Sequence, residues 1–203
     1  LRYRPATQDD TDVLRIWESA GTAHSDAYTL GIGDADTATG DGDIVLFEAQ
    51  LNAPSSIYYG IITCGLPLNA GPHTYILRSA LHSLDGWVRT GEPPMSMPKL
   101  EANADLSAFL LDTNGNVLGG IRTPFVDVPL AKLSGSGQEG DAFCGLFGTT
   151  LGFTPDELRA LYPTTQDFVT KWNAATDAAV ATGAILAIDA ENIKAAAKNF
   201  IIK

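Results

Sequence analysis

Residues 73–90 carry the clearest periodic pattern of the chain. Apolar side chains recur there every three or four positions, as along one face of an α-helix; they are Ile76, Leu77, Ala80, Leu81, Leu84, Trp87 and Val88. Gly91 suits the end of a helix, and Pro93-Pro94 stop its continuation. The pattern therefore predicts a helix over 73–90, whose apolar stripe needs a sheet or other helices to cover it.

The chain beyond residue 150 also has helical patterns. Thr154-Pro155-Asp156-Glu157 is a capping box and predicts the start of one helix. A longer helix is predicted from about residue 165 to 182, ended by Gly183, with an apolar face made of Phe168, Val169, Trp172, Ala175, Ala179 and Val180. Asp189 is placed to cap a final alanine-rich helix that reaches about Phe200.

Two segments have the patterns of strands. Residues 12–19 alternate between two sides, which predicts a short strand leading into a turn of small residues at 21–26. Residues 106–122 predict a hairpin, because their Asn-Gly pair supplies the positive φ angles of a tight turn. A lone strand cannot bury both of its faces, so the segment at 12–19 needs neighbouring strands. Residues 32–43 are rich in Gly, Asp, Thr and Ala, which predicts an exposed loop.

The composition is that of one globular unit. The 203 residues are 45% hydrophobic and 18% charged, and the sequence has no repeat or linker, so we treat 1–203 as a single unit. Lys and Arg number 13 against 24 Asp and Glu, a formal net charge of −11. This charge disfavours binding to nucleic acids and to anionic membrane surfaces. No apolar run reaches ~18 residues, so we expect no membrane span.

His24 is the main candidate for chemistry. It follows the predicted strand directly and stands among small residues, which leave room for a substrate. An imidazole titrates near neutral pH and can take up and return a proton in one catalytic cycle. A loop histidine without a chemical role is the alternative. His73 and His82, on the predicted helix, are assigned structural or solvent-facing roles.

Other motifs that would define a site do not occur in the sequence. The acidic residues between 34 and 43 lack the EF-hand spacing, so we expect a solvated loop and no metal site. The sequence has no G-x-S-x-G elbow, no P-loop and no Rossmann glycine motif, and we expect no cofactor. Cys64 and Cys144 do not fit a zinc pattern, and their number alone leaves two buried thiols as an alternative to a disulfide.

Four blocks of sequence carry a family resemblance. They are residues 17–26 (WESAGTAHSD), 64–72 (CGLPLNAGP), 119–129 (GGIRTPFVDVP) and 144–150 (CGLFGTT). With these blocks in order, the chain resembles a bacterial, often actinobacterial, α/β-hydrolase-domain family of serine hydrolases, over nearly its whole length. The resemblance implies the α/β class, and specifically the C-terminal part of an α/β-hydrolase-like fold. That part would hold the last strand of the sheet, the histidine loop and a helical and hairpin extension.

The resemblance implies a carboxylic-ester hydrolase with a Ser-His-Asp/Glu triad, in which His24 is the matching histidine. Since the chain order of such a triad is nucleophile, acid, histidine, the other two members would lie before Leu1. We therefore expect an upstream N-terminal segment of the same precursor as partner, a small-molecule ester as substrate, and no activity from 1–203 alone. The chain begins without Met or a signal segment, which fits this expectation. The alternative is a non-catalytic binding or structural module on a hydrolase-like scaffold.

The matched blocks also suggest supporting roles. Cys64 and Cys144 each begin a Cys-Gly-Leu block, so we predict a disulfide between them and a secreted or cell-envelope protein. Two thiols in a cytoplasmic protein are the alternative. Arg122 and Asp127 could form an ion pair that orders a loop beside the active-site mouth, or could contact substrate directly. Asp26, two positions after His24, is grouped with them as support.

Overall fold

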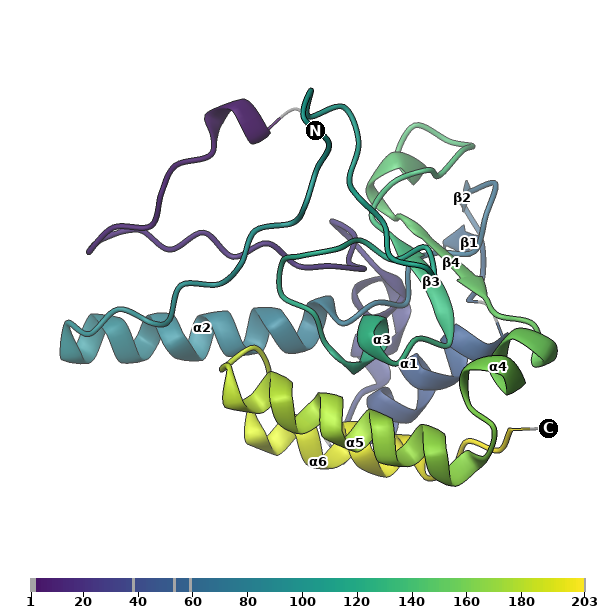
Figure 1. The fold of residues 1–203 in the computed structure, drawn as a ribbon. Helices are drawn as coiled ribbons and strands as arrows, with labels where there is room; N and C mark the ends of the chain where they lie inside the picture. The colour runs from purple at the N-terminus through teal and green to yellow at the C-terminus, as the bar shows by residue number, and fades with distance from the viewer. Residues whose placement is uncertain (1–2, 38, 53, 59, 203) are drawn as a thin grey trace.

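The computed structural model describes residues 3–37, 39–52, 54–58 and 60–202, and Figure 1 shows their arrangement. The helices are α1 Asp41–Asn52, α2 His73–Thr90, α3 Pro124–Asp127, α4 Pro155–Leu161, α5 Thr165–Ala181 and α6 Ala187–Ala197. The strands are β1 Ile57–Tyr58, β2 Ile62–Thr63, β3 Ala131–Ser134 and β4 Thr149–Gly152. Short helical turns are formed by Arg4–Ala6, Tyr28–Ile32, Gly33–Ala35 and Cys144–Leu146.

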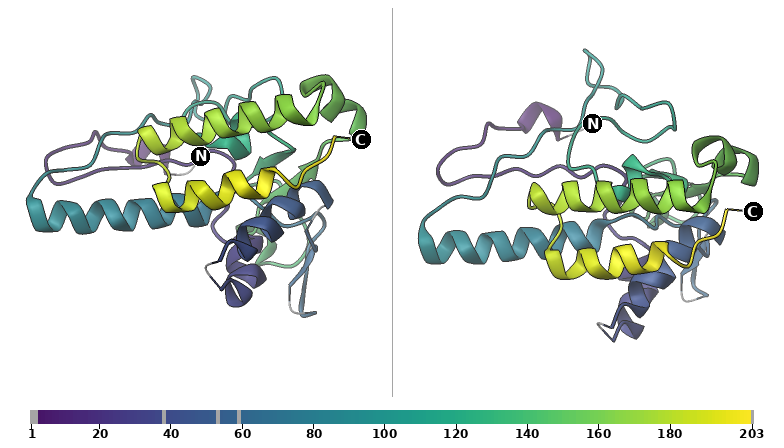
Figure 2. Two further views of the ribbon diagram at one scale, coloured as in Figure 1. Left: turned by 90° about the horizontal axis from the view of Figure 1, so that it is seen from below. Right: turned by 60° about the horizontal axis from the view of Figure 1, so that its bottom comes forward.

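The helices are arranged around one end of the molecule, apart from α2. α5 and α6 lie side by side and antiparallel, with α1 against α6 and α3 against α5. Both views of Figure 2 show α2 extending away from these helices, so that its far end projects from the body of the protein. No helix in the part of the chain that the structure describes is long and apolar enough to span a membrane.

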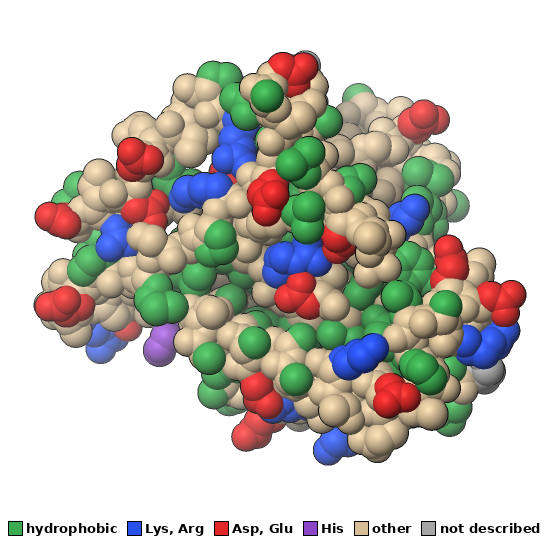
Figure 3. Space-filling model, in the orientation of Figure 1, with side chains coloured by type: hydrophobic (Ala, Val, Ile, Leu, Met, Phe, Trp, Pro, Cys, Tyr) green, Lys and Arg blue, Asp and Glu red, His purple; other side chains and the backbone are tan. Residues whose placement is uncertain are grey.

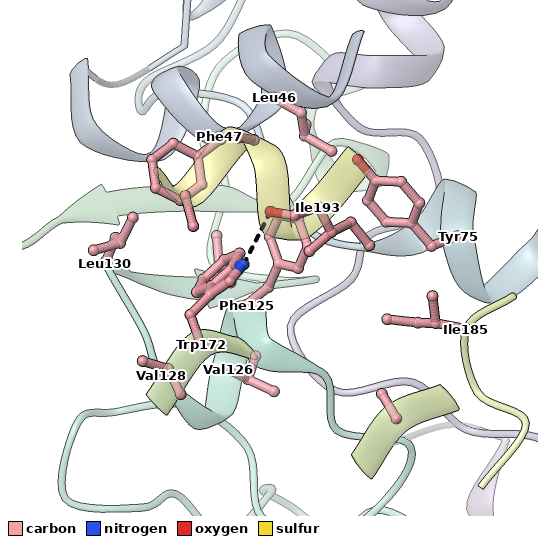
Figure 4. Close-up of a cluster of buried hydrophobic side chains, with 14 of the residues drawn as sticks. Leu46, Phe47, Tyr75, Phe125, Val126, Val128, Leu130, Trp172, Ile185 and Ile193 are labelled. Atoms are coloured by element: carbon pink, nitrogen blue, oxygen red, sulfur yellow. Dashed lines mark hydrogen bonds between the residues drawn. The ribbon is translucent and has the colours of Figure 1, made fainter. Parts of the chain in front are cut away.

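The hydrophobic core lies between α1, α3, α5 and α6 (Figure 4). The indole ring of Trp172 is its centre: the ring centroid of Phe47 lies 5.3 Å away and that of Phe125 lies 5.2 Å away. The indole N–H donates to the carbonyl oxygen of Ile193 at 3.1 Å, which satisfies the one polar group of the buried ring. The core therefore joins the C-terminal helices to α1 and α3 around aromatic rings.

The described residues form two small antiparallel sheets. β1 pairs with β2, and β3 pairs with β4 in a register that runs from Ala131 opposite Gly152 to Ser134 opposite Thr149. Ala131 and Leu133 turn inward and are buried, while Lys132 between them is exposed, as the two-residue period of a strand requires. Helices combined with small sheets agree with the predicted α/β class in its coarse form.

The predicted helices at 73–90 and 165–182 are confirmed, since α2 and α5 occupy these ranges to within one residue. Gly91 ends α2 with a φ of 77°, and its N–H donates to the carbonyl of Trp87 at 2.8 Å. The capping box at Thr154 is also present. The hairpin turn forms as well: the N–H of Asp112 donates to the carbonyl of Asn116 at 2.8 Å.

The predicted strand at 12–19 is wrong. Ser19 makes a single parallel bridge with Ile121, and no ladder extends from it along the segment. The N–H of Ile16 donates to a carboxylate oxygen of Asp10 at 3.0 Å. The Asp10 side chain therefore accepts the backbone hydrogen bond of Ile16 that a neighbouring strand would otherwise accept.

The predicted exposed loop at 32–43 is also wrong at its end, because α1 begins at Asp41 and Asp43 is buried. The phenol of Tyr28 donates to the carboxylate of Asp36 at 2.6 Å, and a guanidinium N–H of Arg78 donates to the same phenol oxygen at 2.6 Å. Arg78 comes from a distant part of the chain and holds the segment against α2. Local composition could not reveal this contact.

The last helix begins earlier than predicted. Leu186 is the residue before its first turn and Asp189 lies within that turn, so Asp189 does not cap the helix end. Its carboxylate instead accepts a hydrogen bond from Arg78 of α2 at 2.9 Å. The Asp189 side chain, which the local pattern assigns to a helix cap, therefore forms a long-range ion pair with Arg78.

Candidate active site

His24 lies in a loop between the bridge at Ser19 and the helical turn Tyr28–Ile32. Its side chain is exposed, whereas its neighbours Ala23 and Asp26 are buried. The loop is thus fastened on both sides of the histidine while the imidazole faces solvent. Among the described residues, His24 forms no hydrogen bond or ion pair, so its ring is not held by a carboxylate or hydroxyl of that part of the chain.

Asn69 ties both ends of the His24 loop to the β3–β4 sheet. Its side-chain amide N–H groups donate to the carbonyl oxygens of Gly21 and Ser134, each at 3.1 Å. Its backbone carbonyl accepts from the N–H of Ala27 at 2.7 Å, and its own N–H donates to the carbonyl of Phe147 at 3.0 Å. Asn69 is completely buried, so these bonds form away from water, where an unpaired partner would be costly. The sequence analysis did not single out this residue.

Two glycines allow the backbones around the loop to approach one another. A Cβ atom at Gly71 would lie 2.0 Å from the carbonyl oxygen of Gly21, and one at Gly148 would lie 2.2 Å from the carbonyl oxygen of Ser134. No side chain can occupy such positions without displacing the backbone. Both glycines belong to the blocks 64–72 and 144–150, which gives a physical reason for glycine in each.

The Cys64–Cys144 disulfide is confirmed, with the two Cα atoms 5.5 Å apart. It holds the helical turn Cys144–Leu146, and the carbonyl of Leu146 accepts a hydrogen bond from the N–H of Ser25 at 3.1 Å. Both sulfurs lie in a small second core with Leu68 and Phe147. The crosslink therefore acts on the residue next to His24 through one hydrogen bond.

Asp26 is completely buried and caps the helical turn that follows the loop. One carboxylate oxygen accepts from the N–H of Thr29 at 2.9 Å and from its hydroxyl at 2.7 Å. The other carboxylate oxygen has no hydrogen-bond partner among the described residues. Asp26 therefore fixes the direction in which the chain leaves His24.

Arg122 forms the expected ion pair with Asp127, with Nε donating at 2.6 Å. It also donates to Asp112 at 2.8 Å, a partner in the hairpin turn that the sequence did not indicate. Burial alone would lower the pKa of Arg122, but the bonds and charges of the two aspartates outweigh it and raise the pKa above its ordinary value. Arg122 follows Ile121, whose N–H and carbonyl pair with the backbone on either side of Ser19. The contacts of Arg122 with Asp112 and Asp127 thus hold the backbone next to Ile121, which pairs with the segment leading to His24.

The other sequence candidates lie elsewhere. His73 begins α2, and His82 is exposed on the same helix. Within the ranges that the structure describes, no three His, Cys, Asp or Glu side chains are placed to hold a metal ion. A pocket of about 410 Å³ opens between α1, α4 and the residues after α6, and His24 is not among its lining residues.

Among the acidic residues predicted to lie in a solvated loop, Asp43 differs from the prediction in being buried. Its buried carboxylate accepts a hydrogen bond from the phenol of Tyr75. Burial is the main reason that the pKa of Asp43 is raised, and the charges of Asp189 and Asp36 act in the same direction. The bond from Tyr75 and the charge of Arg78 oppose the rise in pKa without cancelling it.

The four blocks of the sequence meet around His24. Block 17–26 contains the loop, and block 64–72 supplies Asn69. The backbone of Ile121 in block 119–129 pairs with block 17–26, and the carbonyl of Leu146 in block 144–150 accepts a hydrogen bond from Ser25. Comparison with family models gives a match to the alpha/beta hydrolase domain over residues 1–195. The chain belongs to this family.

The match to the alpha/beta hydrolase domain includes all four blocks and His24. Comparison with curated proteins and with solved structures gives no match. The family assignment thus supplies a hydrolase-like scaffold, and the loop geometry shows how the chain presents one exposed imidazole.

Proposed function

We propose that this chain is the histidine-bearing part of an exported bacterial serine hydrolase that cleaves carboxylic esters, with His24 as its general base. The observation that carries the proposal is the convergence of Asn69, Asp26 and the Cys64–Cys144 disulfide on one exposed histidine. A catalytic base needs such support, because a displacement of about 1 Å can cost about 100-fold in rate. The disulfide is compatible with an oxidising, extracellular location.

In the proposed reaction, the imidazole of His24 removes the proton from a serine hydroxyl as its oxygen attacks the ester carbonyl. The same proton then passes to the departing alcohol, which leaves an acyl group on the serine. His24 next removes a proton from a water molecule as its oxygen attacks the acyl carbonyl. The bond to the serine then breaks, and the proton passes from His24 to the serine oxygen as the acid is released. The serine and the carboxylate that orients the ring belong, in this proposal, to an upstream N-terminal segment of the same precursor, which the active enzyme requires.

A non-catalytic module is the second candidate. It is favoured by the absence, among the described residues, of any hydrogen-bond partner for the imidazole. In that case the loop would present His24 to a binding partner and carry out no chemistry. A serine-directed fluorophosphonate probe separates the two candidates, because it labels only an activated serine.

The test uses the full-length protein that contains these residues. We expect His24→Ala to lower ester turnover by about three orders of magnitude or more, and to suppress fluorophosphonate labelling, with the unfolding midpoint unchanged. His82→Ala is the matched control, because His82 is also an exposed histidine but lies on α2. Wild-type turnover in the His24 variant would rule out its role as the base.

A further inference from the structure

The turn at residues 142–146 presents an uncharged, largely apolar surface. Phe143 and Leu146 are 61% and 42% exposed, although Cys144 between them is buried. A Cβ atom at Gly145 would meet no atom within 4 Å other than those of its neighbours in the chain, so the surface above the turn is open. In the face shown in Figure 3, hydrophobic side chains are interspersed with charged groups, whereas residues 142–146 carry no charge. Such a surface is suited to hold an apolar part of a ligand.

The turn is fastened on both sides of its exposed side chains. The disulfide between Cys64 and Cys144 attaches its first half to the chain beside β2. Phe147, directly after the turn, is buried against Tyr58, with the ring centroids 5.9 Å apart. The two exposed apolar side chains therefore stand on a backbone that is held in place before any ligand arrives. A surface prepared in this way loses little conformational freedom on binding.

The same turn borders His24. The carbonyl oxygen of Leu146 accepts a hydrogen bond at 3.1 Å from the N–H of Ser25, the residue after the histidine. Two positions further on, a Cβ atom at Gly148 would lie 2.8 Å from the Cβ atom of Ala23, the residue before the histidine. Residues 146–148 therefore run along residues 23–25. A molecule bound at the exposed imidazole accordingly has Leu146 beside it.

Charge narrows the chemistry of that molecule. The charged residues of the segment 134–148 are Glu139 and Asp141, and both are acidic and exposed. A carboxylate on the substrate would be repelled by these side chains and by the formal net charge of −11. A neutral alkyl group meets no such repulsion, and it removes apolar surface from water when it covers Phe143 and Leu146. The turn therefore favours an uncharged apolar group over an anion.

The chemistry proposed for His24 identifies the part of an ester that lies at the turn. The imidazole returns its proton to the oxygen of the departing alcohol, so that oxygen must come within hydrogen-bond reach of the ring. The acyl carbon meanwhile stays bonded to the serine. The alcohol part of the ester is therefore the part that lies next to the histidine, and it is this part that meets Leu146.

We propose that Phe143 and Leu146 bind the alcohol part of the ester and make the hydrolase selective for neutral esters of apolar alcohols. This inference rests on the proposed function and adds the substrate class. The alkyl chain of the alcohol packs on the two side chains while its oxygen faces His24. The acyl part lies away from the turn, so the selectivity concerns one side of the ester bond only.

Two series of esters test the proposal on the full-length protein. Ethyl, butyl and hexyl acetate vary only the alcohol part, whereas ethyl acetate, butyrate and hexanoate vary only the acyl part. We expect kcat/KM to rise about twofold for each CH₂ group added to the alcohol, as burial of roughly half of its surface gives. Leu146→Ser and Phe143→Ser should remove most of this rise and leave the acyl series unchanged. Leu151→Ser is the matched control, because Leu151 is 43% exposed on β4, and it should keep the rise.

Binding of 1-hexanol tests the surface without relying on turnover. In backbone amide NMR spectra of the full-length protein, we expect 1-hexanol to shift the resonances of Ser25 and Gly145 until they saturate. Leu151→Ser should saturate at the wild-type concentration. Leu146→Ser should need a concentration roughly fivefold higher, because it loses the apolar side chain that the alkyl chain covers. Unchanged resonances elsewhere in the spectrum show that each variant is folded.

The absence of a saturating shift at Gly145 would overturn the proposal, whatever the turnover. A rise with alcohol length that persists in Leu146→Ser, or a loss that falls on the acyl series instead, would also overturn it and leave the role of His24 intact. The proposed function fails separately: full ester turnover in His24→Ala would remove the role of the histidine, while saturating shifts with 1-hexanol would still place an alcohol-binding surface at the turn.

Discussion

α2 and α5 have apolar stripes of the same kind but differ in what covers them. On α5 the side chains of Phe168 and Trp172 are completely buried among rings from α1 and α3. On α2 the side chains of Leu81 and Val88 are largely exposed. Periodicity reports that a helix has an apolar side, and it does not report whether the cover lies within the same chain. The difference marks α5 as part of the core and leaves one apolar side of α2 exposed to solvent.

Truncating one side chain on each helix should give the sharpest contrast. Trp172→Ala should lower the free energy of unfolding by about 3–5 kcal/mol, because it empties the centre of the aromatic core and removes the indole hydrogen bond to the carbonyl of Ile193. Leu84→Ala in residues 1–203 should change the free energy by less than about 0.5 kcal/mol, since the leucine is half exposed. Urea unfolding followed by circular dichroism measures both. Similar losses in the two variants would contradict the comparison.

An intermediate loss of stability is expected on substitution of Asn69, a buried polar residue beside the His24 loop. Asn69→Ala should cost about 1–3 kcal/mol, because the buried carbonyls of Gly21 and Ser134 each lose a donor. The N–H of Gly71, which donates to the Asn69 side chain at 2.8 Å, should exchange its hydrogen faster in the variant. Asn52→Ala, at an exposed position, is the control. Unchanged hydrogen exchange at Gly71 would show that its bond to the Asn69 side chain is not formed in solution.

The sequence predicted those parts of the molecule that are determined by neighbouring residues. The ranges of α2 and α5, the capping box at Thr154 and the turn before Asn116 all follow from residues close in sequence. The Cys64–Cys144 pairing came from the matched blocks, because spacing alone left free thiols open.

The parts that could not be predicted depend on partners far along the chain. Asn69 has no periodic signature, and its role arises only when Gly21 and Ser134 are brought beside it. The strand expected at 12–19 has the right alternation, but a ladder also needs a neighbouring strand. The local pattern predicts a solvated loop at Asp43, because its partner Tyr75 lies on another helix and leaves no signal near it in the sequence. The polarity of neighbouring residues therefore predicts an exposed side chain at Asp43, which is in fact buried.

The smallest expected effect is a change in how stability depends on pH, and it compares two aspartates in the first turn of α1. The pKa of buried Asp43 is raised in the folded protein, so the folded state binds a proton more readily than the unfolded chain. Its contribution to stability is therefore present below the unfolded pKa and is lost as pH rises through the folded pKa. Asp43→Asn keeps an acceptor for Tyr75 and should remove this decline, which makes the variant relatively more stable toward neutral pH.

Asp41 is the matched control, because it is exposed in the same turn and hydrogen bonds from Thr37 and Thr39 lower its pKa. Its contribution has the opposite sign: it is present above the unfolded pKa and is lost as pH falls through the folded pKa. Asp41→Asn should therefore flatten the pH profile on its acid side and leave the decline due to Asp43 in place. Both substitutions remove one negative charge near the start of α1, so the influence of the helix dipole is similar in the two variants. Thermal unfolding midpoints between about pH 2 and about pH 8 measure both slopes. Identical profiles for the two variants would mean that burial of Asp43 in the cluster with Tyr75 and Arg78 does not control its titration.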